Sequence, residues 1–194
     1  MIPYFEDLIG VVKDSLESID ENVYEKLVSD CVDTLKRGNK IVVSGLGKNV
    51  PVCDKFVGTM LSLGLNAGFM HTNSAFHGDL GMVHDGDLVI ILTKSGSTAE
   101  SIALYNVLAS RNVELWLLTF SKDGKLSKVM DNILLVHLEH EGDIWNIVPN
   151  NSTTLNLIIL QALAIEISKR MDVSLHQFKM NHPGGAIGEA LKNV

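Results

Sequence analysis

Short apolar runs alternate with longer amphipathic segments along most of this chain. Five of the runs have the length and aliphatic content of strands that are buried on both faces. We predict strands at Lys40–Ser44, Asn66–His71, Asp87–Thr93, Glu114–Phe120 and Asn132–His137, with helices between them at Pro51–Leu63, Ser74–Gly81, Thr98–Arg111 and Lys125–Met130. Strands joined by helical crossovers pair in parallel. The pattern therefore predicts an α/β fold: a doubly wound, five-stranded parallel sheet in a three-layer α/β/α arrangement.

Helices also flank this alternating region. Two of them, Tyr4–Leu16 and Glu21–Arg37, are expected before the first strand, and a final helix is expected from Ser152 to Met171. The sequence shows no internal repeat, low-complexity tract or linker. We therefore predict a single domain over residues 1–194, with the helical pair of residues 1–38 packed on it.

Charge and composition narrow the classes of partner. The formal net charge of −7 disfavours binding to nucleic acid and to anionic membranes, because both require a basic surface. An anionic ligand would need a local positive environment instead. We find neither a signal-peptide pattern nor an apolar run of membrane-spanning length, so we expect a cytoplasmic protein. Cys31 and Cys53 lie in apolar helical patterns and are expected to be buried free thiols.

A turn rich in hydroxyl side chains, Thr93-Lys94-Ser95-Gly96-Ser97-Thr98, follows the third predicted strand and precedes a predicted helix. Backbone N–H groups and the helix dipole favour an anion at such a position, and the hydroxyls would complete a phosphate cradle. Ordinary N-capping of the helix is the alternative. Four hydroxyl residues around one glycine exceed what a cap requires, so we favour phosphate binding.

A glycine-rich turn, Ser44-Gly45-Leu46-Gly47-Lys48, ends the first predicted strand. It is not a P-loop, because Val42 and Asn49 occupy positions where that motif needs glycine and a hydroxyl residue. Val50 likewise stands where a dinucleotide-binding fingerprint needs glycine. What remains is a turn with a lysine that can reach an anion, or a tight turn with a solvated lysine.

Several ionisable residues follow the strands at the same edge. His77 suits proton exchange near neutral pH, and a structural histidine paired with Asp79 is an equal alternative. Glu100 falls in the first turn of a helix, where an acid also complements the helix dipole. Glu141 follows the fifth strand near Trp145, and burial there would raise the pKa of its carboxyl to suit a general base. A merely solvated loop glutamate is the alternative.

Two further segments stand out. Ser152-Thr153-Thr154 opens the last long helix, and Asn181-His182-Pro183-Gly184-Gly185 imposes a fixed backbone path near the C-terminus. We expect the second segment to deliver His182 to a specific place, such as a neighbouring subunit. A metal site built from His71, His77 and Asp79 would lack the compact spacing of known zinc motifs.

Taken together and in this order, the motifs resemble the sugar isomerase (SIS) domain family, and more narrowly its arabinose-5-phosphate isomerases. The resemblance runs from about Lys40 to the C-terminus. It is carried by the glycine-rich turn at Ser44–Lys48, the segment His77–Val83, the hydroxyl-rich turn, Ser152–Thr154 and the segment His182–Gly185. The turn sequence Thr93–Thr98 departs from the usual Ser-Asn-Ser-Gly-Glu-Ser by gaining a positive charge and losing an acid.

The resemblance implies a flavodoxin-like fold and the interconversion of D-arabinose 5-phosphate and D-ribulose 5-phosphate through an enediol, which would supply Kdo biosynthesis for lipopolysaccharide or capsule. It implies no cofactor, and a homotetramer with shared active sites. The family's catalytic positions fall on Lys48, Glu100, Glu141, His182 and His77, and we choose Glu141 as the base. Its substrate-binding positions fall on Ser44, Gly45, Gly47, Thr93, Lys94, Ser95, Ser97 and Thr98, and an inhibitory zinc ion would fall at His71.

Two alternatives remain open. One is an isomerase of hexulose 6-phosphate or sedoheptulose 7-phosphate with the same fold. The other is a non-catalytic sugar-phosphate sensor, which is disfavoured because the residues before the first strand lack a basic recognition helix. The chain ends shortly after Gly188, where many relatives continue into CBS domains, so we expect a stand-alone catalytic domain.

Overall fold

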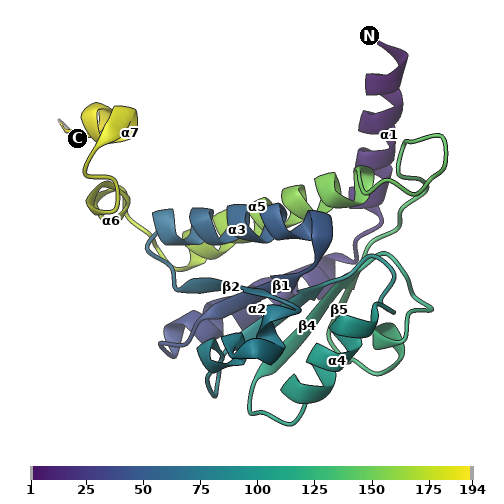
Figure 1. The fold of residues 1–194 in the computed structure, drawn as a ribbon. Coiled ribbons are helices and arrows are strands. Elements are labelled where there is room, and N and C mark those ends of the chain that lie inside the picture. Colours follow the sequence, from purple (N-terminus) through teal and green to yellow (C-terminus); the bar gives the residue numbers. More distant parts are fainter. Residues whose placement is uncertain (1, 193–194) are drawn as a thin grey trace.

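The computed structural model describes residues 2–192 and contains the predicted five-stranded parallel sheet (Figure 1). Its strands are β1 (Ile41–Gly45), β2 (Ala67–His71), β3 (Leu88–Leu92), β4 (Glu114–Thr119) and β5 (Ile133–Leu135). They lie in the order β2-β1-β3-β4-β5, and all neighbouring pairs are parallel. The order reverses beside β1, which creates a switch point where ligands bind in such sheets, beyond the carboxyl ends of the strands.

Helices cover both faces of the sheet. One face packs against α2 (Glu21–Lys36), α3 (Val50–Ser62) and α5 (Asn151–Arg170), and the other packs against α4 (Ala99–Leu108). Side chains alternate between the two cores along each strand. In β3, for example, Ile90 joins the larger core, whereas its neighbour Ile91 joins the smaller one. The predicted three-layer architecture is therefore confirmed.

Three predicted elements differ in the structure. Two 3₁₀ turns, η2 (Ser74–His77) and η3 (Asp79–Met82), replace the helix expected at Ser74–Gly81, because Gly78 adopts a φ of 117° between them. The helix expected at Lys125–Met130 is only the short turn η4 (Leu126–Lys128). The fifth strand is shorter than expected because it pairs only with β4, over three positions.

The sequence pattern predicts that the long helix α5 is the last helix of the chain, and this prediction is wrong. It is followed by α6 (Leu175–Met180) and α7 (Gly185–Ala190). Ser174 and Gln177 begin α6 with a reciprocal capping box, a signal that is readable in the sequence.

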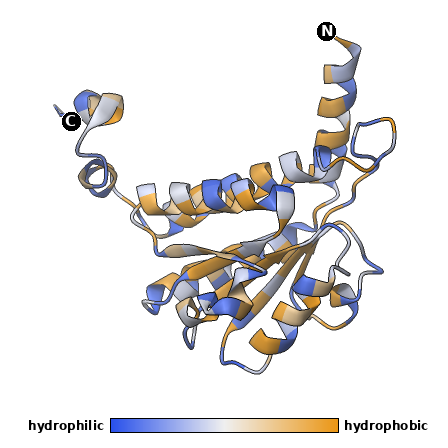
Figure 2. Ribbon diagram, viewed as in Figure 1, coloured by the Kyte–Doolittle hydropathy of each residue, from blue (hydrophilic) through white to orange (hydrophobic). Residues whose placement is uncertain are grey.

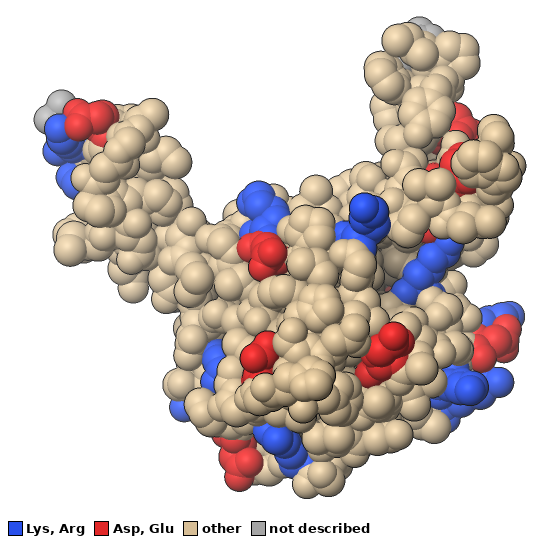
Figure 3. Space-filling model, in the orientation of Figure 1, with Lys and Arg blue, Asp and Glu red and all other residues tan. Residues whose placement is uncertain are grey.

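Two arms extend from the body of the molecule. One is α1 (Pro3–Glu17), of which the N-terminal part projects away from the sheet, and the other consists of α6 and α7 on the opposite side (Figure 1). Both arms include hydrophobic stretches, coloured orange in Figure 2. Exposed apolar side chains on the arms include Phe5, Ile9, Leu175 and Met180. The upper part of the α1 arm shows few charged atoms in the view of Figure 3. Such patches are typical of surfaces that bind another protein chain.

Within residues 2–192, no helix combines the length and the apolarity needed to cross a membrane. Cys31 and Cys53 are buried free thiols, as predicted, and burial raises the pKa of the Cys53 thiol to about 12.

Candidate active site

The glycine-rich turn after β1 passes directly into α3 through the short turn η1 (Gly47–Asn49). Gly45 packs so closely on the start of α3 that a Cβ at this position would lie 2.9 Å from the Cβ of Asn49 and 3.2 Å from the Sγ of Cys53. The close approach fixes the direction of the turn, and the exposed Lys48 follows it at the carboxyl edge of the sheet. Ser44, by contrast, is fully buried, and its hydroxyl pairs with that of Thr72 at 3.0 Å.

The hydroxyl-rich turn after β3 does not act as a helix cap. Thr98 stands at the N-cap position of α4, but its side chain makes no capping hydrogen bond and pairs with the hydroxyl of Thr93 at 3.1 Å instead. Ser95 and Ser97 lie at the same edge of the sheet, and Ser95 is exposed. The turn thus presents hydroxyls and an uncapped helix N-terminus to the outside, an arrangement that suits an anion.

Glu141 lies fully buried between the loop that follows β5 and the N-terminus of α5. Its Oε1 accepts hydrogen bonds from Lys94 Nζ at 2.6 Å and from Ser152 Oγ at 2.7 Å. Its Oε2 accepts from the backbone N–H of Ser152 at 2.9 Å and of Asn150 at 3.1 Å. The carboxylate therefore joins the turn after β3 to the last long helix.

The expected rise in the pKa of Glu141 is wrong. Burial alone would raise this pKa, but the hydrogen bonds from Lys94, Ser152 and Asn150 outweigh burial and hold the pKa below its usual value. Glu141 is consequently a carboxylate at neutral pH.

A second acid organises the loop between β5 and α5. The carboxylate of Asp143 accepts hydrogen bonds from the backbone N–H groups of Trp145, Ile147 and Val148, each at 2.9 Å. The loop conformation is thereby fixed while its apolar side chains point outward, and Trp145 is 67% exposed.

A small cavity of about 90 Å³ opens at the carboxyl edge, between the turn after β1, the turn after β3 and the N-terminus of α5. It is lined by Leu46, Lys48, Asn49, Lys94, Pro149, Ser152, Thr153 and Asn156. A larger cavity of about 450 Å³ lies on the other side of Lys94 and is also lined by Ser95. Lys48 supplies a local positive charge for an anionic ligand in an otherwise acidic protein, whereas the charge of Lys94 is paired with Glu141.

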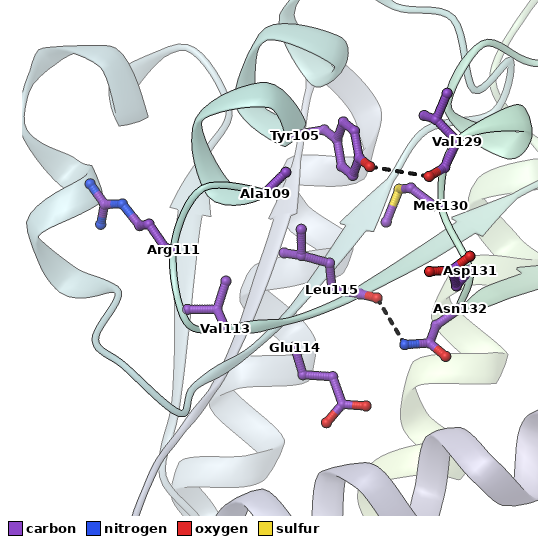
Figure 4. Close-up of a pocket in the computed structure, with 10 residues that line it drawn as sticks. All are labelled: Tyr105, Ala109, Arg111, Val113, Glu114, Leu115, Val129, Met130, Asp131 and Asn132. Atoms are coloured by element: carbon purple, nitrogen blue, oxygen red, sulfur yellow. Dashed lines mark hydrogen bonds between the residues drawn. The ribbon is translucent and has the colours of Figure 1, made fainter.

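Another cavity, of about 350 Å³, lies at the opposite, amino edge of the sheet (Figure 4). Tyr105, Arg111 and Glu114 are among the residues that line it. Burial and the neighbouring Asp30 raise the pKa of Glu114 to about 6. Ligands of doubly wound sheets bind at the carboxyl edge, so we assign no site to this cavity.

Residues 34–166 match the family described as SIS domain. The chain belongs to the SIS domain family. This SIS domain is 32% identical over 183 residues to the arabinose 5-phosphate isomerase KdsD of Pseudomonas aeruginosa, a match that covers 94% of this chain and 56% of that protein. It is 31% identical over 186 residues to the KdsD of Escherichia coli K12, covering 96% of this chain and 57% of that protein.

The present chain thus spans a little more than half the length of these curated relatives. Among solved structures, an E. coli CFT073 protein in complex with arabinose 5-phosphate superposes with a TM-score of 0.85 at 27% identity, covering 93% of this chain and 94% of that one. The predicted family and fold are therefore confirmed.

The SIS domain brings some predicted site residues together and leaves others apart. Lys48 and Lys94 line the small cavity, and Lys94 also pairs with Glu141. Glu100 and His77 are exposed near the same edge, and within residues 2–192 no hydrogen bond or ion pair joins Glu100 to Lys48. His71 ends β2, and the described part of the chain holds no group of three or more His, Cys, Asp or Glu side chains suited to a metal ion.

His182 lies far from the cavity of its own chain. The neighbouring Asn181 donates a hydrogen bond to the carbonyl of Ser62 at the C-terminal end of α3, whereas Lys48 precedes the N-terminal end of that helix. A helix of 13 residues separates its two ends by about 20 Å. His182 itself stacks on Phe178 in the C-terminal arm.

Sequence reasoning missed two features of the site. The ion pair between Lys94 and Glu141 joins residues that are 47 positions apart, and no local pattern reveals it. Asn156 follows Ser152 by four positions and so lies on the same face of α5. This helical spacing is a signal that could have placed it at the cavity.

Proposed function

We propose that this SIS domain interconverts D-arabinose 5-phosphate and D-ribulose 5-phosphate through an enediol intermediate. The observation that carries the proposal is Glu141, a buried carboxylate paired with Lys94 beside a cavity that Lys48 also lines, at the sheet edge where α/β folds bind ligands. The two KdsD relatives and the relative solved with arabinose 5-phosphate support this substrate. Arabinose 5-phosphate formed in this way would connect the reaction to Kdo biosynthesis, for lipopolysaccharide or capsule.

The phosphate group occupies the hydroxyl-rich turn after β3. Ser95, Ser97 and Thr98 supply hydroxyls, and the N-terminus of α4 supplies a positive dipole end. The phosphate is the unreactive end of the substrate, so its binding energy positions the reacting carbons near Glu141 and Lys48.

Glu141 is the base that carries the proton between C2 and C1. While Lys94 is paired with Glu141, it neutralises the carboxylate and makes it a weak base. The Lys94 side chain is 44% exposed, and the substrate's negative charge draws its ammonium away. Burial is then opposed only by the hydrogen bonds from Ser152 and Asn150, so the pKa of Glu141 rises and the carboxylate becomes a stronger base as the substrate binds.

The remaining groups act on the oxygen atoms of the substrate. Lys48 stabilises negative charge on the enediol oxygens, an effect typically worth about 3–4 kcal/mol per donor. His77 or His182 moves the hydroxyl protons and assists the opening of the furanose ring, and Glu100 orients Lys48 or a substrate hydroxyl. His182 comes from a neighbouring subunit, because about 20 Å of α3 separates it from Lys48 in its own chain. The apolar arms build the homotetramer that this sharing requires.

The test is a panel of aldose and ketose phosphates assayed with the purified protein and with Glu141→Gln. We expect the wild type to form ribulose 5-phosphate from arabinose 5-phosphate. The glutamine variant should lose about 100- to 10,000-fold in kcat, the range that a positioned general base typically contributes.

Two outcomes would overturn parts of the proposal. Turnover of sedoheptulose 7-phosphate or hexulose 6-phosphate, without turnover of arabinose 5-phosphate, would identify the alternative isomerase. Near-normal turnover by Glu141→Gln would exclude Glu141 as the base.

A further inference from the structure

Asn156 lines the small cavity and has a buried polar atom without a hydrogen-bond partner among the described residues. The residue is 2% exposed and lines the cavity between Lys48 and Lys94. Its Nδ2 donates to Asn49 Oδ1 at 2.9 Å. Its Oδ1 is buried and accepts no hydrogen bond from residues 2–192. A buried carbonyl left without a donor is costly, so its retention at a cavity indicates a ligand.

Apart from Lys48, the hydroxyl and ammonium donors that line the cavity are already engaged. Ser152 Oγ and Lys94 Nζ both donate to Glu141, and Thr153 Oγ1 donates to the backbone carbonyl of Asn150 at 2.9 Å. Lys48 remains, with an exposed side chain that carries positive charge on the same cavity. The cavity therefore presents Lys48 as its remaining charged donor and Asn156 Oδ1 as an acceptor without a hydrogen-bond donor in the described part of the chain.

A hydroxyl group matches this pair, because it can accept from an ammonium and donate to a carbonyl at the same time. A fully ionised phosphate or carboxylate oxygen cannot donate, so it would leave Asn156 Oδ1 unsatisfied. We propose that Asn156 and Lys48 form a hydroxyl subsite that recognises the polyol chain of the sugar phosphate rather than its anionic end. The inference rests on the proposed function and adds a specificity-determining residue to it.

Calorimetric titration of wild type and Asn156→Leu tests the subsite. The two probes are D-arabinitol 5-phosphate, which carries the hydroxyls but cannot be isomerised, and inorganic phosphate. In the leucine variant we expect the arabinitol phosphate to bind at least about 10-fold more weakly, since an unmet hydrogen bond has this order of effect. Inorganic phosphate should bind within about 2-fold of wild type, because it contacts the turn after β3.

Thermal unfolding separates a functional from a structural role. Leucine is close to asparagine in size and leaves no orphan carbonyl, so the Asn156→Leu protein should unfold at the same temperature as the wild type or at a higher one. Asn49→Ala serves as the matched control. It removes the same hydrogen bond between the two amides but keeps Asn156 Oδ1. The binding of arabinitol phosphate should therefore weaken less than in Asn156→Leu.

Three results would overturn the subsite. They are unchanged binding of arabinitol phosphate by Asn156→Leu, equal weakening of both ligands, and no binding of arabinitol phosphate by the wild type. If the wild type binds this ligand through Asn156 but does not convert arabinose 5-phosphate, the subsite stands and the proposed reaction fails. If conversion occurs and the variant binds as the wild type does, the reaction stands and the subsite fails.

Discussion

At the scale of single residues, the ionisation of Glu141 depends on the balance between burial and its hydrogen-bond donors. Lys94 is the charged donor among them, and it is contributed by a different turn from the one that holds the glutamate. In the folded protein the carboxyl has a lower pKa than in the unfolded chain. Glu141 therefore stabilises the folded state at neutral pH, and this stabilisation is lost as the pH falls through its folded-state pKa.

The pH dependence of kcat/KM should report this arrangement. In the wild type, Glu141 stays ionised over the range from about pH 5 to 8, so it contributes no loss of activity there. Lys94→Met removes the opposing charge and lets burial raise the pKa of Glu141, so the acidic limb of the profile should move up by at least about one pH unit.

Lys48→Met is the matched control for this profile. It removes an equal charge from the same cavity without touching Glu141, so activity should fall while the acidic limb stays in place. An acidic limb that does not move in Lys94→Met would contradict the coupling between Lys94 and Glu141.

At the scale of elements, the junction of β1 and α3 sets the position of Lys48. Gly45→Ala would push a methyl group against the Asn49 and Cys53 side chains. Overpacking of this kind typically costs about 1–3 kcal/mol, and we expect that loss in the free energy of unfolding measured with urea. The displaced start of α3 should also lower kcat/KM.

Gly58→Ala provides the comparison on the same helix. A Cβ at this position meets nothing within 4 Å, so the substitution should stabilise the protein by up to about 1 kcal/mol through helix propensity. Equal stability of Gly45→Ala and wild type would show that the close packing of this turn is not required.

Elements with a strong periodic pattern were predictable from the sequence, and those that depend on single backbone positions were not. The run Leu88–Leu92 is apolar throughout and could only be a buried strand. The segment Ser74–Met82 has helix-like composition, but Gly78 interrupts it with a left-handed backbone that the sequence pattern does not specify. The turns that carry Lys48 and Lys94 were located correctly, whereas the contacts between turns required the tertiary structure.

At the scale of the whole molecule, one chain does not bring the proposed catalytic groups together, and our proposal assigns the two arms to an assembly that does. Exposed apolar residues on α1 and on the C-terminal arm would be buried in an assembly. In the assembly that we propose, His182 enters a cavity that belongs to another subunit.

Mixing two inactive variants tests the sharing of sites. His182→Ala and Lys48→Met should each be nearly inactive alone. After subunit exchange, a site with Lys48 from one chain and His182 from another is intact, and random mixing in a symmetric oligomer should restore about a quarter of the activity. Recovery at this level, measured against unmixed controls, supports shared sites. A mixture that stays inactive after confirmed exchange contradicts them.

The two tryptophans of the chain differ sharply in environment, and this has a practical consequence. Trp116 is 1% exposed within the sheet, while Trp145 stands in water on the loop that Asp143 shapes next to Glu141. Their intrinsic fluorescence therefore separates into a blue, quencher-resistant component and a red, quencher-accessible one. The red component gives the protein a built-in optical reporter of the loop that follows Glu141, without any added label.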